Sequence, residues 1–498
     1  MTDEQYDIVI VGSGLGGLAC GVMLAKEGMK VCVVEQGALF GGCLQSFRRA
    51  GHTIDTGMHY LGSMERGQIM DQYLRYFGVR DKIDTLPLDN AFDHLTLGSH
   101  GTFVLRQSYD SFYDELAARF PHERKGLRRY CEVVQHIGSS INVDVHRTGQ
   151  ISRLAKGYHD ISATAFVEEH ITDPMLRAVL FGSNILCGSS YEHTNLYHHA
   201  MITHSNIEGA HRFICGSQQL PNALCHEIEG HGGVLLNRSR VTHFTIKDDQ
   251  ISGVMLADGR HIKAKRYISN LHPATTFAMV EPTRLIKKAY RSRLSLLPNT
   301  YGIFSVYLTL KPRSLRHINH NRYLHHDDNV WDNVMRSLDH LPAIMISTQC
   351  TADNIAYADV VTLMTPVDTN LFAPYAASTF GHRPAGYTTL KAQIAEQMIA
   401  LALQHYPELA SSIDHIYTAS PLTYAHYTAT PQGSAYGIDK RYSQSLATHF
   451  GTRTKIPNLL LTGQNINVHG AIGVTLTAAA TCSELLGMKY LSKKIAAV

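Results

Sequence analysis

The apolar and polar positions of the first forty residues divide into a strand, a glycine-rich turn, a helix and a second strand. Residues 6–11 are almost wholly apolar, which predicts a buried strand, and a cluster of glycines follows at once. An apolar-periodic helix is expected from Leu15 to Glu27, and a second buried strand over residues 30–34 ends on Glu35. This order predicts a βαβ unit with two parallel strands.

The turn has the spacing G-x-G-x-x-G, which is typical of a dinucleotide-binding fold. Gly12 allows the tight turn, Gly14 lets a pyrophosphate approach the backbone, and Gly17 lets the helix pack closely on the strand. Glu35 stands where a carboxylate can accept hydrogen bonds from ribose hydroxyls. Because the strand, the helix and the acidic strand end all have the expected spacing, we expect this unit to bind a dinucleotide.

Later patterns extend the alternation of strands and helices. Residues 89–105 predict a strand pair, Ser108 or Asp110 caps a helix, and another helix covers residues 122–137. Residues 150–212 are expected to be mainly helical. Further strands are expected at residues 232–268, 301–310, 343–348 and 360–365, and a helix at residues 390–406. The last unit is a strand at residues 459–461, a glycine-bearing loop and a helix over residues 473–486.

Composition excludes several classes of protein. The 498 residues are 44% hydrophobic and 17% charged, with a formal net charge of +3, so we expect a globular protein and no nucleic-acid partner. No run reaches the roughly 18–20 apolar residues that span a bilayer, and the acidic start does not resemble a signal peptide. Nine cysteines without a C-x-x-C pair suggest reduced thiols in the cytoplasm. The thirty histidines are scattered, and adjacent pairs point to different faces, so no metal site is expected.

Five blocks along the chain carry a resemblance to a known family. They are residues 7–18, 41–43, 55–62, 421–437 (with Pro421, Tyr424, Tyr427, Pro431 and Tyr436) and 462–473. With these blocks the chain resembles the FAD-dependent phytoene desaturase superfamily, in particular the branch of carotenoid cis–trans isomerases and all-trans-retinol 13,14-reductase. The resemblance spans nearly the whole chain. It implies non-covalently bound FAD and a reaction at double bonds of a long apolar molecule.

The resemblance assigns each part of FAD to particular residues. The pyrophosphate would lie on the turn, the adenosine ribose on Glu35 beside Gln36, and the adenine beside Val241. The 41–43 and 56–59 blocks would line the ribityl chain and the ring, and the C-terminal segment would close over the flavin. Asn465 departs from the aspartate that much of the family has there. The implied cofactor residues are Gly12, Ser13, Gly14, Leu15, Gly16, Gly17, Glu35, Gln36, Gly41, Gly42, Cys43, Thr56, Gly57, Met58, His59, Val241, Gly463, Gln464, Asn465, Gly473 and Val474.

The implied architecture is a doubly wound α/β Rossmann-type FAD domain, made of separate segments, with a substrate domain of mixed sheet and helices. The FAD domain is expected in residues 1–85, 205–290 and 450–498. The substrate domain is expected in residues 86–204 and 291–449. The pocket would lie between the two domains.

Reduction of an isolated C=C bond needs a hydride from the flavin and a proton from an acid. His59, Tyr60 and Tyr427 are the candidate acids, followed by Tyr436 and His469; each of them can equally be a structural side chain. The sequence has no second G-x-G-x-x-G after a strand. NAD(P)H, if it is the electron donor, would therefore bind transiently in the same pocket.

We expect an oxidoreductase that saturates or desaturates C=C bonds of a polyene, an isoprenoid or another lipid, and we favour saturation. A redox-neutral cis–trans isomerase that needs reduced flavin is the alternative. Amine oxidation shares the fold, but no motif favours it. A non-catalytic module like the Rab escort and GDP-dissociation-inhibitor proteins, which bind prenylated partners, is a further alternative. The direction of reaction, the oligomeric state and peripheral membrane contact stay open.

Overall fold

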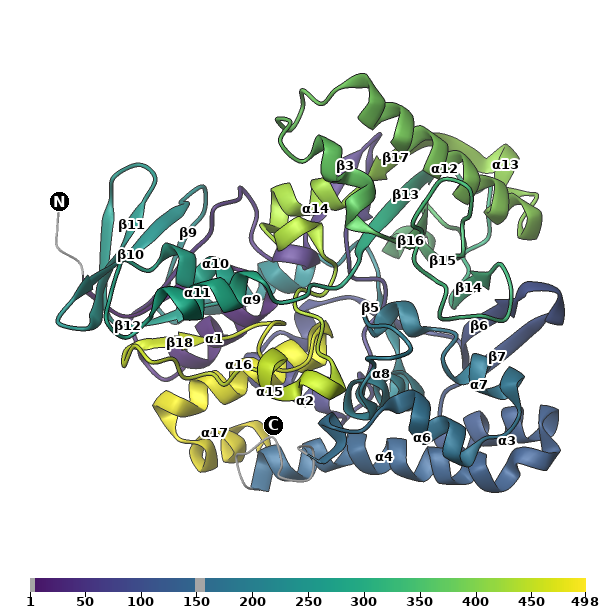
Figure 1. Cartoon of the computed structure of the whole chain (residues 1–498), viewed down its shortest axis with the longest axis horizontal. Coiled ribbons are helices and arrows are strands. Elements are labelled where there is room, and N and C mark those ends of the chain that lie inside the picture. Colours follow the sequence, from purple (N-terminus) through teal and green to yellow (C-terminus); the bar gives the residue numbers. More distant parts are fainter. Residues whose placement is uncertain (1–4, 148–156) are drawn as a thin grey trace.

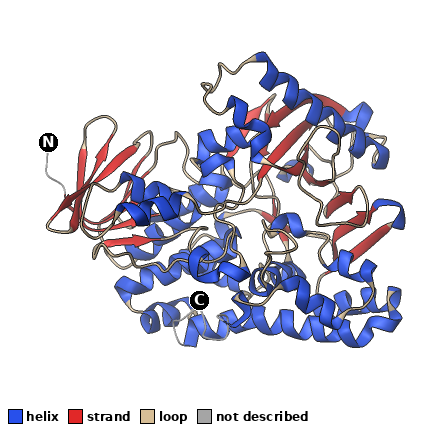
Figure 2. Ribbon diagram, viewed as in Figure 1, coloured by secondary structure: helices blue, strands red, loops and turns tan. Residues whose placement is uncertain are grey.

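Two seven-stranded sheets organise the computed structural model, which describes residues 5–147 and 157–498 (Figures 1 and 2). The first sheet has the order β10-β11-β12-β1-β2-β9, with β18 also beside β12. β1 pairs in parallel with β2 and β12, and the parallel pairs β2–β9 and β12–β18 extend this part of the sheet. Its strands are β1 (Gln5–Val11), β2 (Val31–Val34), β9 (Val234–Leu236), β10 (Val241–Lys247), β11 (Gln250–Leu256), β12 (His261–Ser269) and β18 (Leu459–Leu461).

Helices cover both faces of the first sheet. Ile8 and Ile10 of β1 belong to one hydrophobic core, which includes the helices α1, α9 and α16. Val9 and Val11 belong to another, with Phe277 of α10. Because successive side chains of a strand point to opposite faces, a strand buried on both sides reads as a continuous apolar run. The helices around this sheet are α1 (Leu15–Ala25), α2 (Ile69–Phe77), α9 (Gln219–Gly230), α10 (Pro273–Met279), α11 (Lys288–Ser295), α16 (Gly470–Leu486) and α17 (Met488–Ile495).

The second sheet has the order β17-β13-β16-β15-β14-β6-β7, and only β14 and β6 pair in parallel. The helix α12 packs on it through Ile394 and Met398 (Figure 1). The strands are β6 (Ala91–Leu97), β7 (Thr102–Arg106), β13 (Gly302–Leu310), β14 (Asn321–His325), β15 (Ala343–Gln349), β16 (Val360–Val367) and β17 (Ile413–Ala419). The neighbouring helices are α12 (Ala385–His405), α13 (Leu409–Ser412) and α14 (Pro421–Thr428).

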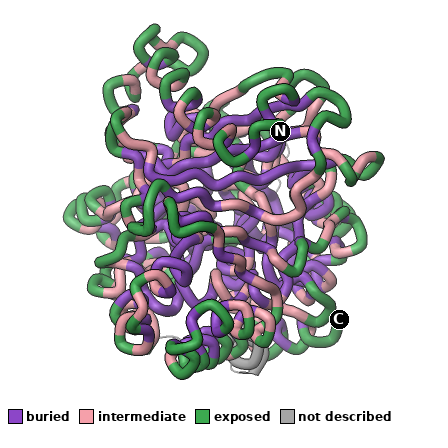
Figure 3. The backbone as a smooth tube through the Cα atoms, turned by 90° about the vertical axis from the view of Figure 1, so that its right-hand side faces the viewer, coloured by how far each residue is buried: buried purple, intermediate pink, exposed green. Residues whose placement is uncertain are grey.

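A group of helices lies below the second sheet in Figure 1 and completes the molecule. It contains α3 (Tyr109–Arg119), α4 (Arg124–Arg147), α6 (Ala163–His170), α7 (Pro174–Leu180) and α8 (Leu196–Gly209), and the short α15 (Ser445–Thr448) lies nearer the C-terminal helices. Two small antiparallel sheets join β3 (Ser46–Arg49) to β4 (His52–Asp55) and β5 (Thr85–Pro87) to β8 (His211–Phe213). Exposed backbone lies mainly at the periphery, and buried backbone runs through the sheets (Figure 3). No helix in the described part of the chain is both long and apolar enough to cross a bilayer.

The structure confirms the α/β class with a doubly wound sheet and a second, mixed sheet. The strands of the first sheet fall in residues 5–34, 234–269 and 459–461, while the exact domain boundaries stay predictions. The last long helix begins at Gly470, and not near residue 473 as the sequence pattern predicted. The pattern placed the start too late because Gly470 and Gly473 weaken the helical signal of the first turn. Part of the expected 150–212 helical region, residues 150–156, lies outside the described residues.

Candidate functional site

A cavity of about 780 Å³ lies between the two sheets. Val11 and Val34 at the ends of β1 and β2 line it on one side, and Ile303, Met345 and Met364 of the second sheet line it on the other. Its volume falls in the range of roughly 300–1,000 Å³ that is usual for small-molecule and cofactor sites. The segments that meet here come from both ends and from the middle of the chain.

Most of the implied cofactor residues line this one cavity. They are Gly12, Ser13, Gly14, Leu15, Gly16, Glu35, Gln36, Gly41, Gly42, Cys43, Thr56, Gly57, Met58, His59, Val241, Gln464, Asn465, Gly473 and Val474. Gly17 and Gly463 lie behind the lining. A Cβ at Gly17 would collide with the carbonyl oxygen of Gly12, and a Cβ at Gly463 would collide with the side chain of Asn270. These two glycines act through close packing of the wall.

The turn between β1 and α1 leaves backbone N–H groups free for a ligand. Gly12 has a φ of +94°, a conformation that favours glycine. Gly14 caps α1, and among the described residues no side chain caps this end and no acidic residue lies in the first turn. An uncapped helix N-terminus binds anions, because its N–H groups and its dipole both favour negative charge. This turn therefore fits a pyrophosphate.

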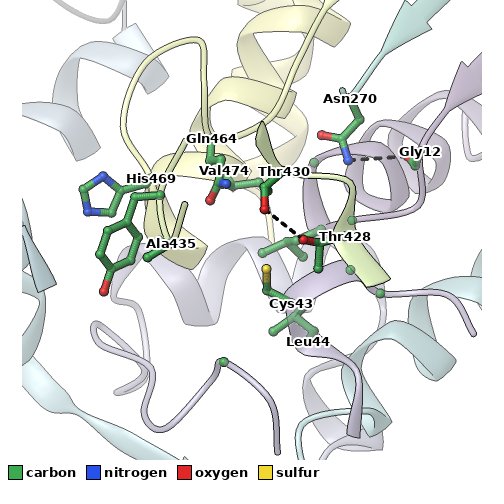
Figure 4. A pocket seen from close by; sticks show the side chains of 18 of the residues that line it. Gly12, Cys43, Leu44, Asn270, Thr428, Thr430, Ala435, Gln464, His469 and Val474 are labelled. Atoms are coloured by element: carbon green, nitrogen blue, oxygen red, sulfur yellow. Dashed lines mark hydrogen bonds between the residues drawn. The ribbon is translucent and has the colours of Figure 1, made fainter. Parts of the chain in front are cut away.

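The 41–43 block packs directly against this turn. The Gly41 N–H donates to the carbonyl oxygen of Ser13 at 3.1 Å. Gly41 and Gly42 both have positive φ, at +122° and +58°, and a Cβ at Gly42 would lie 3.1 Å from the Cα of Gly14. Gly41 and Gly42 thus allow this segment to contact the backbone of the turn between β1 and α1. The next residue, Cys43, lies on the wall of the cavity (Figure 4).

Glu35 lies at the end of β2 with its carboxylate fixed by three donors. Ser13 donates from its N–H at 3.0 Å and from its hydroxyl at 2.6 Å, and the Gly37 N–H donates at 2.7 Å. The Ser239 N–H donates to the backbone oxygen of Glu35 at 2.8 Å, which brings the segment that contains Val241 to the same place. A carboxylate held in this way can still accept hydrogen bonds from hydroxyl groups of a ligand.

The C-terminal segment brings a second helix N-terminus to the cavity. The first-turn residues of α16, Gly470 to Val474, line it, and within the described chain α16 also has no capping side chain (Figure 4). The Asn465 side-chain oxygen accepts from the Ile438 N–H at 3.0 Å. The amide at this position is therefore already engaged with the backbone through its oxygen. As an amide, Asn465 brings no negative charge to this wall.

Asn270 is a wall residue that the sequence analysis missed. It follows β12, next to β1, and its side-chain amide donates to the Gly12 carbonyl oxygen at 3.4 Å (Figure 4). Its side chain is also the group that a Cβ at Gly16 or Gly463 would meet. A polar residue directly after a buried parallel strand was the available signal, because ligands bind at the carboxyl ends of such strands.

Asp55 directly precedes the 56–60 segment of the cavity wall and anchors it. Its carboxylate accepts from the Ser46 hydroxyl at 2.6 Å, from Ser217 N–H at 2.8 Å and from the Gln349 amide at 2.6 Å. Burial raises the pKa of Asp55, and the hydrogen bonds oppose that rise. The residue joins β4, the loop before α9 and the second sheet, so it positions the segment that carries His59 and Tyr60.

Tyr60 is the candidate acid with the most developed hydrogen-bond network. Its hydroxyl lies 3.0 Å from the hydroxyl of Tyr323 and accepts from the Asn206 amide at 3.3 Å. Burial, followed by the nearby charge of Asp93, holds the pKa of Tyr60 well above its ordinary value. The phenol is therefore protonated at neutral pH, and it lines the cavity. Burial also raises the pKa of Asp93 to about 7.

His59 lies next to Tyr60 but has a different electrostatic state. Burial, together with the charge of Arg212, lowers the pKa of His59 to about 3. The imidazole is therefore uncharged at neutral pH and cannot act as an imidazolium acid. Arg212 is itself buried and donates to Ser347 at 2.9 Å and to the Asn321 side chain at 3.0 Å.

The other three candidate acids lie at two different places. Tyr427 lines the outer part of the cavity and is 52% exposed. Tyr436 donates to the Ile185 carbonyl oxygen at 3.1 Å, and His469 hydrogen-bonds the Leu186 carbonyl oxygen at 2.7 Å. The rings of Tyr436 and His469 stack at 4.3 Å between centroids. Since both of these side chains are already bonded to backbone, they are better suited to forming the wall than to transferring protons.

Beyond the polar turn, much of the cavity wall is apolar. Ile185, Leu186 and Met201 line it from the helical part, and Ile303, Met345 and Met364 line it from the second sheet. Such a wall excludes water and offers hydrogen bonds at few points, which suits a long apolar ligand. The cavity thus combines an anion-binding end with an apolar chamber.

Comparison with known proteins shows related sequences and a shared fold. All-trans-retinol 13,14-reductase of Danio rerio is 27% identical to the chain, over 97% of this chain and 86% of its own length. Chloroplastic prolycopene isomerase of Arabidopsis thaliana is 23% identical over 87% of this chain and 74% of its own. The crystal structure of an oxidoreductase from Methanosarcina mazei superposes with a TM-score of 0.60 at 16% identity, covering 95% of this chain and 98% of its own, which shows a shared fold.

The family model described as flavin containing amine oxidoreductase matches residues 15–483. That range runs from the first residue of α1 to the last turn of α16, and so it contains the cavity wall except Val11 at the end of β1 and the turn of residues 12–14. The chain therefore belongs to the family of flavin-containing amine oxidoreductases, a family of flavin-dependent enzymes.

Proposed function

We propose that the protein is an FAD-dependent oxidoreductase that acts on C=C bonds of a long apolar polyene, isoprenoid or lipid, with saturation as its main reaction. The observation that carries this proposal is the composition of the cavity. One wall holds two helix N-termini that no side chain of the described residues caps, the facing chamber is apolar, and the Tyr60 phenol lies in the lining. The similarity to retinol 13,14-reductase and prolycopene isomerase supports a polyene as the substrate class.

The residues divide the cofactor between them. Backbone N–H groups of Gly14 to Gly16 bind the pyrophosphate, Glu35 accepts from the ribose hydroxyls, and Val241 lies beside the adenine. Residues 42–43 and 56–59 line the ribityl chain and the ring, and Gln464, Gly473 and Val474 close over them. When bound, FAD supplies hydride or single-electron chemistry.

Tyr60 is proposed as the proton donor for saturation. Saturation of a C=C bond adds a hydride to one carbon and a proton to the other, so an acid must lie on the substrate side. The Tyr60 phenol is protonated at neutral pH and is oriented by Tyr323 and Asn206. The neutral His59 then acts as a wall residue or as a hydrogen-bond donor.

Redox-neutral cis–trans isomerisation is the second candidate, because prolycopene isomerase is among the similar proteins. In that reaction no hydrogen is added, so Tyr60 would position the polyene and would not lose a proton. The two candidates differ in whether reductant is consumed for each product molecule.

NAD(P)H is proposed to reduce the flavin by transient contact at the same cavity, since the sequence carries one nucleotide fingerprint.

Peripheral contact with a lipid surface would deliver an apolar substrate. Tyr427 at the outer part of the cavity and its ring neighbour Phe380 are 52% and 40% exposed, and both are suited to such contact. Co-sedimentation with phosphatidylcholine vesicles of the wild type and of F380S tests this point.

The decisive experiment is anaerobic reduction of the purified yellow protein with NADPH or NADH. The reduced protein is then mixed with retinol, with cis and trans carotenoids, and with unsaturated fatty acids. Saturation predicts reoxidation of the flavin together with stoichiometric loss of one double bond. Isomerisation predicts a change of geometry with the flavin still reduced.

The outcomes against the proposal are equally definite. Purified protein without flavin after supplementation with FAD would instead favour a lipid-binding module. A flavoprotein whose reduced form neither reoxidises with nor isomerises any unsaturated compound would contradict the assignment to C=C bonds. Reoxidation by imines, or reduction of the flavin by amines, would indicate amine oxidation in its place.

A further inference from the structure

Three histidines that are far apart in the sequence meet outside the cavity lining. They are His159, His198 at the start of α8, and His449 directly after α15. One ring nitrogen of each lies within 4.8 Å of those of the other two. The ring centroids of His159 and His449 are 4.5 Å apart, and those of His198 and His449 are 5.8 Å apart. The arrangement is a convergence of three imidazoles from three separate segments.

Each ring has a buried nitrogen without a hydrogen-bond partner in the described part of the chain. These atoms are Nδ1 of His159, Nε2 of His198 and Nε2 of His449. His198 is only 4% exposed. A buried polar atom without a partner is costly and uncommon, so three of them in one cluster indicate a shared partner.

The state of His449 shows what kind of partner is required. Its Nδ1 lies 3.1 Å from the Ser445 carbonyl oxygen, which can only accept, so Nδ1 carries the proton. In a neutral ring, Nε2 then carries the free lone pair, and it is buried without a partner among the described residues. A hydrogen bond from the far nitrogen to a carbonyl oxygen is the usual second-sphere arrangement of a metal-bound histidine, because it fixes the tautomer and orients the ring.

We propose that His159, His198 and His449 bind a divalent transition metal, with Zn²⁺ as the expected ion. Three neutral imidazoles and no carboxylate suit zinc and its neighbours, and they do not suit Mg²⁺ or Ca²⁺, which prefer oxygen ligands. A water molecule would complete four-coordination. When protonated, Lys440 repels a cation at all three rings, but burial lowers the pKa of Lys440 itself to about 7, so this repulsion weakens above neutral pH.

The proposed metal has a structural role next to the cavity. It would join the segment at residue 159, α8 and the segment after α15, which are separated by 39 and 251 residues along the chain, the differences between positions 159, 198 and 449. A link that closes long loops stabilises the fold by restricting the unfolded chain. The ring of His198 lies 5.9 Å from that of His469, a residue of the cavity wall (Figure 4).

The test uses the full-length flavoprotein, stripped with EDTA, loaded with ZnCl₂ and desalted. Metal analysis is expected to give stoichiometric zinc in the wild type and a large loss in H449A. Zinc is expected to raise the melting temperature of the wild type and to leave that of H449A unchanged. Zinc X-ray absorption is expected to show three imidazole nitrogens at about 2.0–2.1 Å.

The matched control is H199A. His199 is the next residue of α8, but its Nε2 lies 2.7 Å from the Tyr130 hydroxyl, and it is not one of the three clustered histidines. This variant is expected to lose stability and keep its zinc. Failure of the wild type to retain zinc, or equal zinc in H449A, would overturn the proposal. A zinc spectrum without three imidazoles would overturn it too, whatever the stability of either variant. None of these readouts depends on the substrate proposed above.

Discussion

The two ends of the cavity are built in different ways. At the cofactor end, the wall is formed mainly by backbone and glycine residues. Gly12, Gly41 and Gly42 have positive φ, and two helix N-termini have no side-chain cap among the described residues. At the substrate end, side chains from distant segments meet, such as Tyr60, Asn206 and Tyr323. In the proposed function, nucleotide binding therefore depends on local backbone geometry, whereas the chemistry depends on side chains that only the tertiary fold brings together.

The largest loss of stability and of bound flavin is expected from G17A, which changes only the cofactor end. The new Cβ would collide with the backbone oxygen of Gly12, which cannot move aside as a side chain can. The cost should exceed the about 1–3 kcal/mol typical of an overpacked side chain, with loss of bound flavin. Flavin content and thermal unfolding measure it. G230A, where a Cβ meets nothing within 4 Å, is the control and should stay yellow.

The second largest effect, a slower reaction with substrate, is expected from Y60F, which changes only the substrate end. Loss of a general acid typically reduces the rate by about 10²–10⁴-fold. Reoxidation of reduced flavin by substrate should slow by this factor, while flavin content and reduction by NAD(P)H stay as in the wild type. Y427F is the matched control at the outer part of the cavity. Equal rates for Y60F and the wild type would remove Tyr60 from the mechanism.

E35Q is expected to have a moderate effect at the cofactor end. Hydrogen bonds to a charged group contribute about 1.5–3 kcal/mol, so FAD affinity should fall by roughly 10- to 150-fold. Equilibrium binding of FAD to the apoprotein measures this change. The rate of C=C reduction at saturating FAD should be unchanged. A fall in that rate at full flavin occupancy would mean that the two ends are not separable.

The smallest effect concerns pH and Asp93. The pKa of Asp93 is about 7, and its negative charge raises the pKa of Tyr60 and of Tyr323. Above pH 7 the ionised carboxylate therefore makes Tyr60 a weaker acid, and the rate of saturation should fall by less than about tenfold per pH unit. Below pH 7 the rate should level off. In D93N this inflection is expected to disappear; a profile identical to that of the wild type would exclude Asp93.

The residues that the sequence assigns to the cofactor end line one cavity, and they could be grouped from the sequence because their determinants are local. Residues 12–17 and Glu35 lie within one βαβ unit, so their spacing alone specifies a turn, a helix start and a strand end. Asn270 was missed because no spacing links it to Gly12, although β12 and β1 are neighbours. Tyr323 and Asn206, the partners of Tyr60, follow from the pairing of β14 with β6 and the position of α8, which only the tertiary fold determines.

The histidine cluster is another contact between distant residues that the spacing of the sequence does not predict. Adjacent pairs such as His198 and His199 do point apart, as the sequence analysis expected, with His199 bonded to Tyr130. Convergence of His198 with His159 and His449 crosses most of the chain and leaves no periodic signal in the sequence.

The central claim is that one cavity holds the nucleotide at the helix N-termini of α1 and α16 and the reacting double bond beside Tyr60. A crystal structure of the protein with FAD and a non-reactive polyene analogue tests it most directly. We expect the pyrophosphate on Gly14 to Gly16 and the polyene between the flavin ring and Met345, with the Tyr60 hydroxyl on the side of the polyene away from the flavin. A flavin bound elsewhere, or a polyene that does not reach Tyr60, would contradict it.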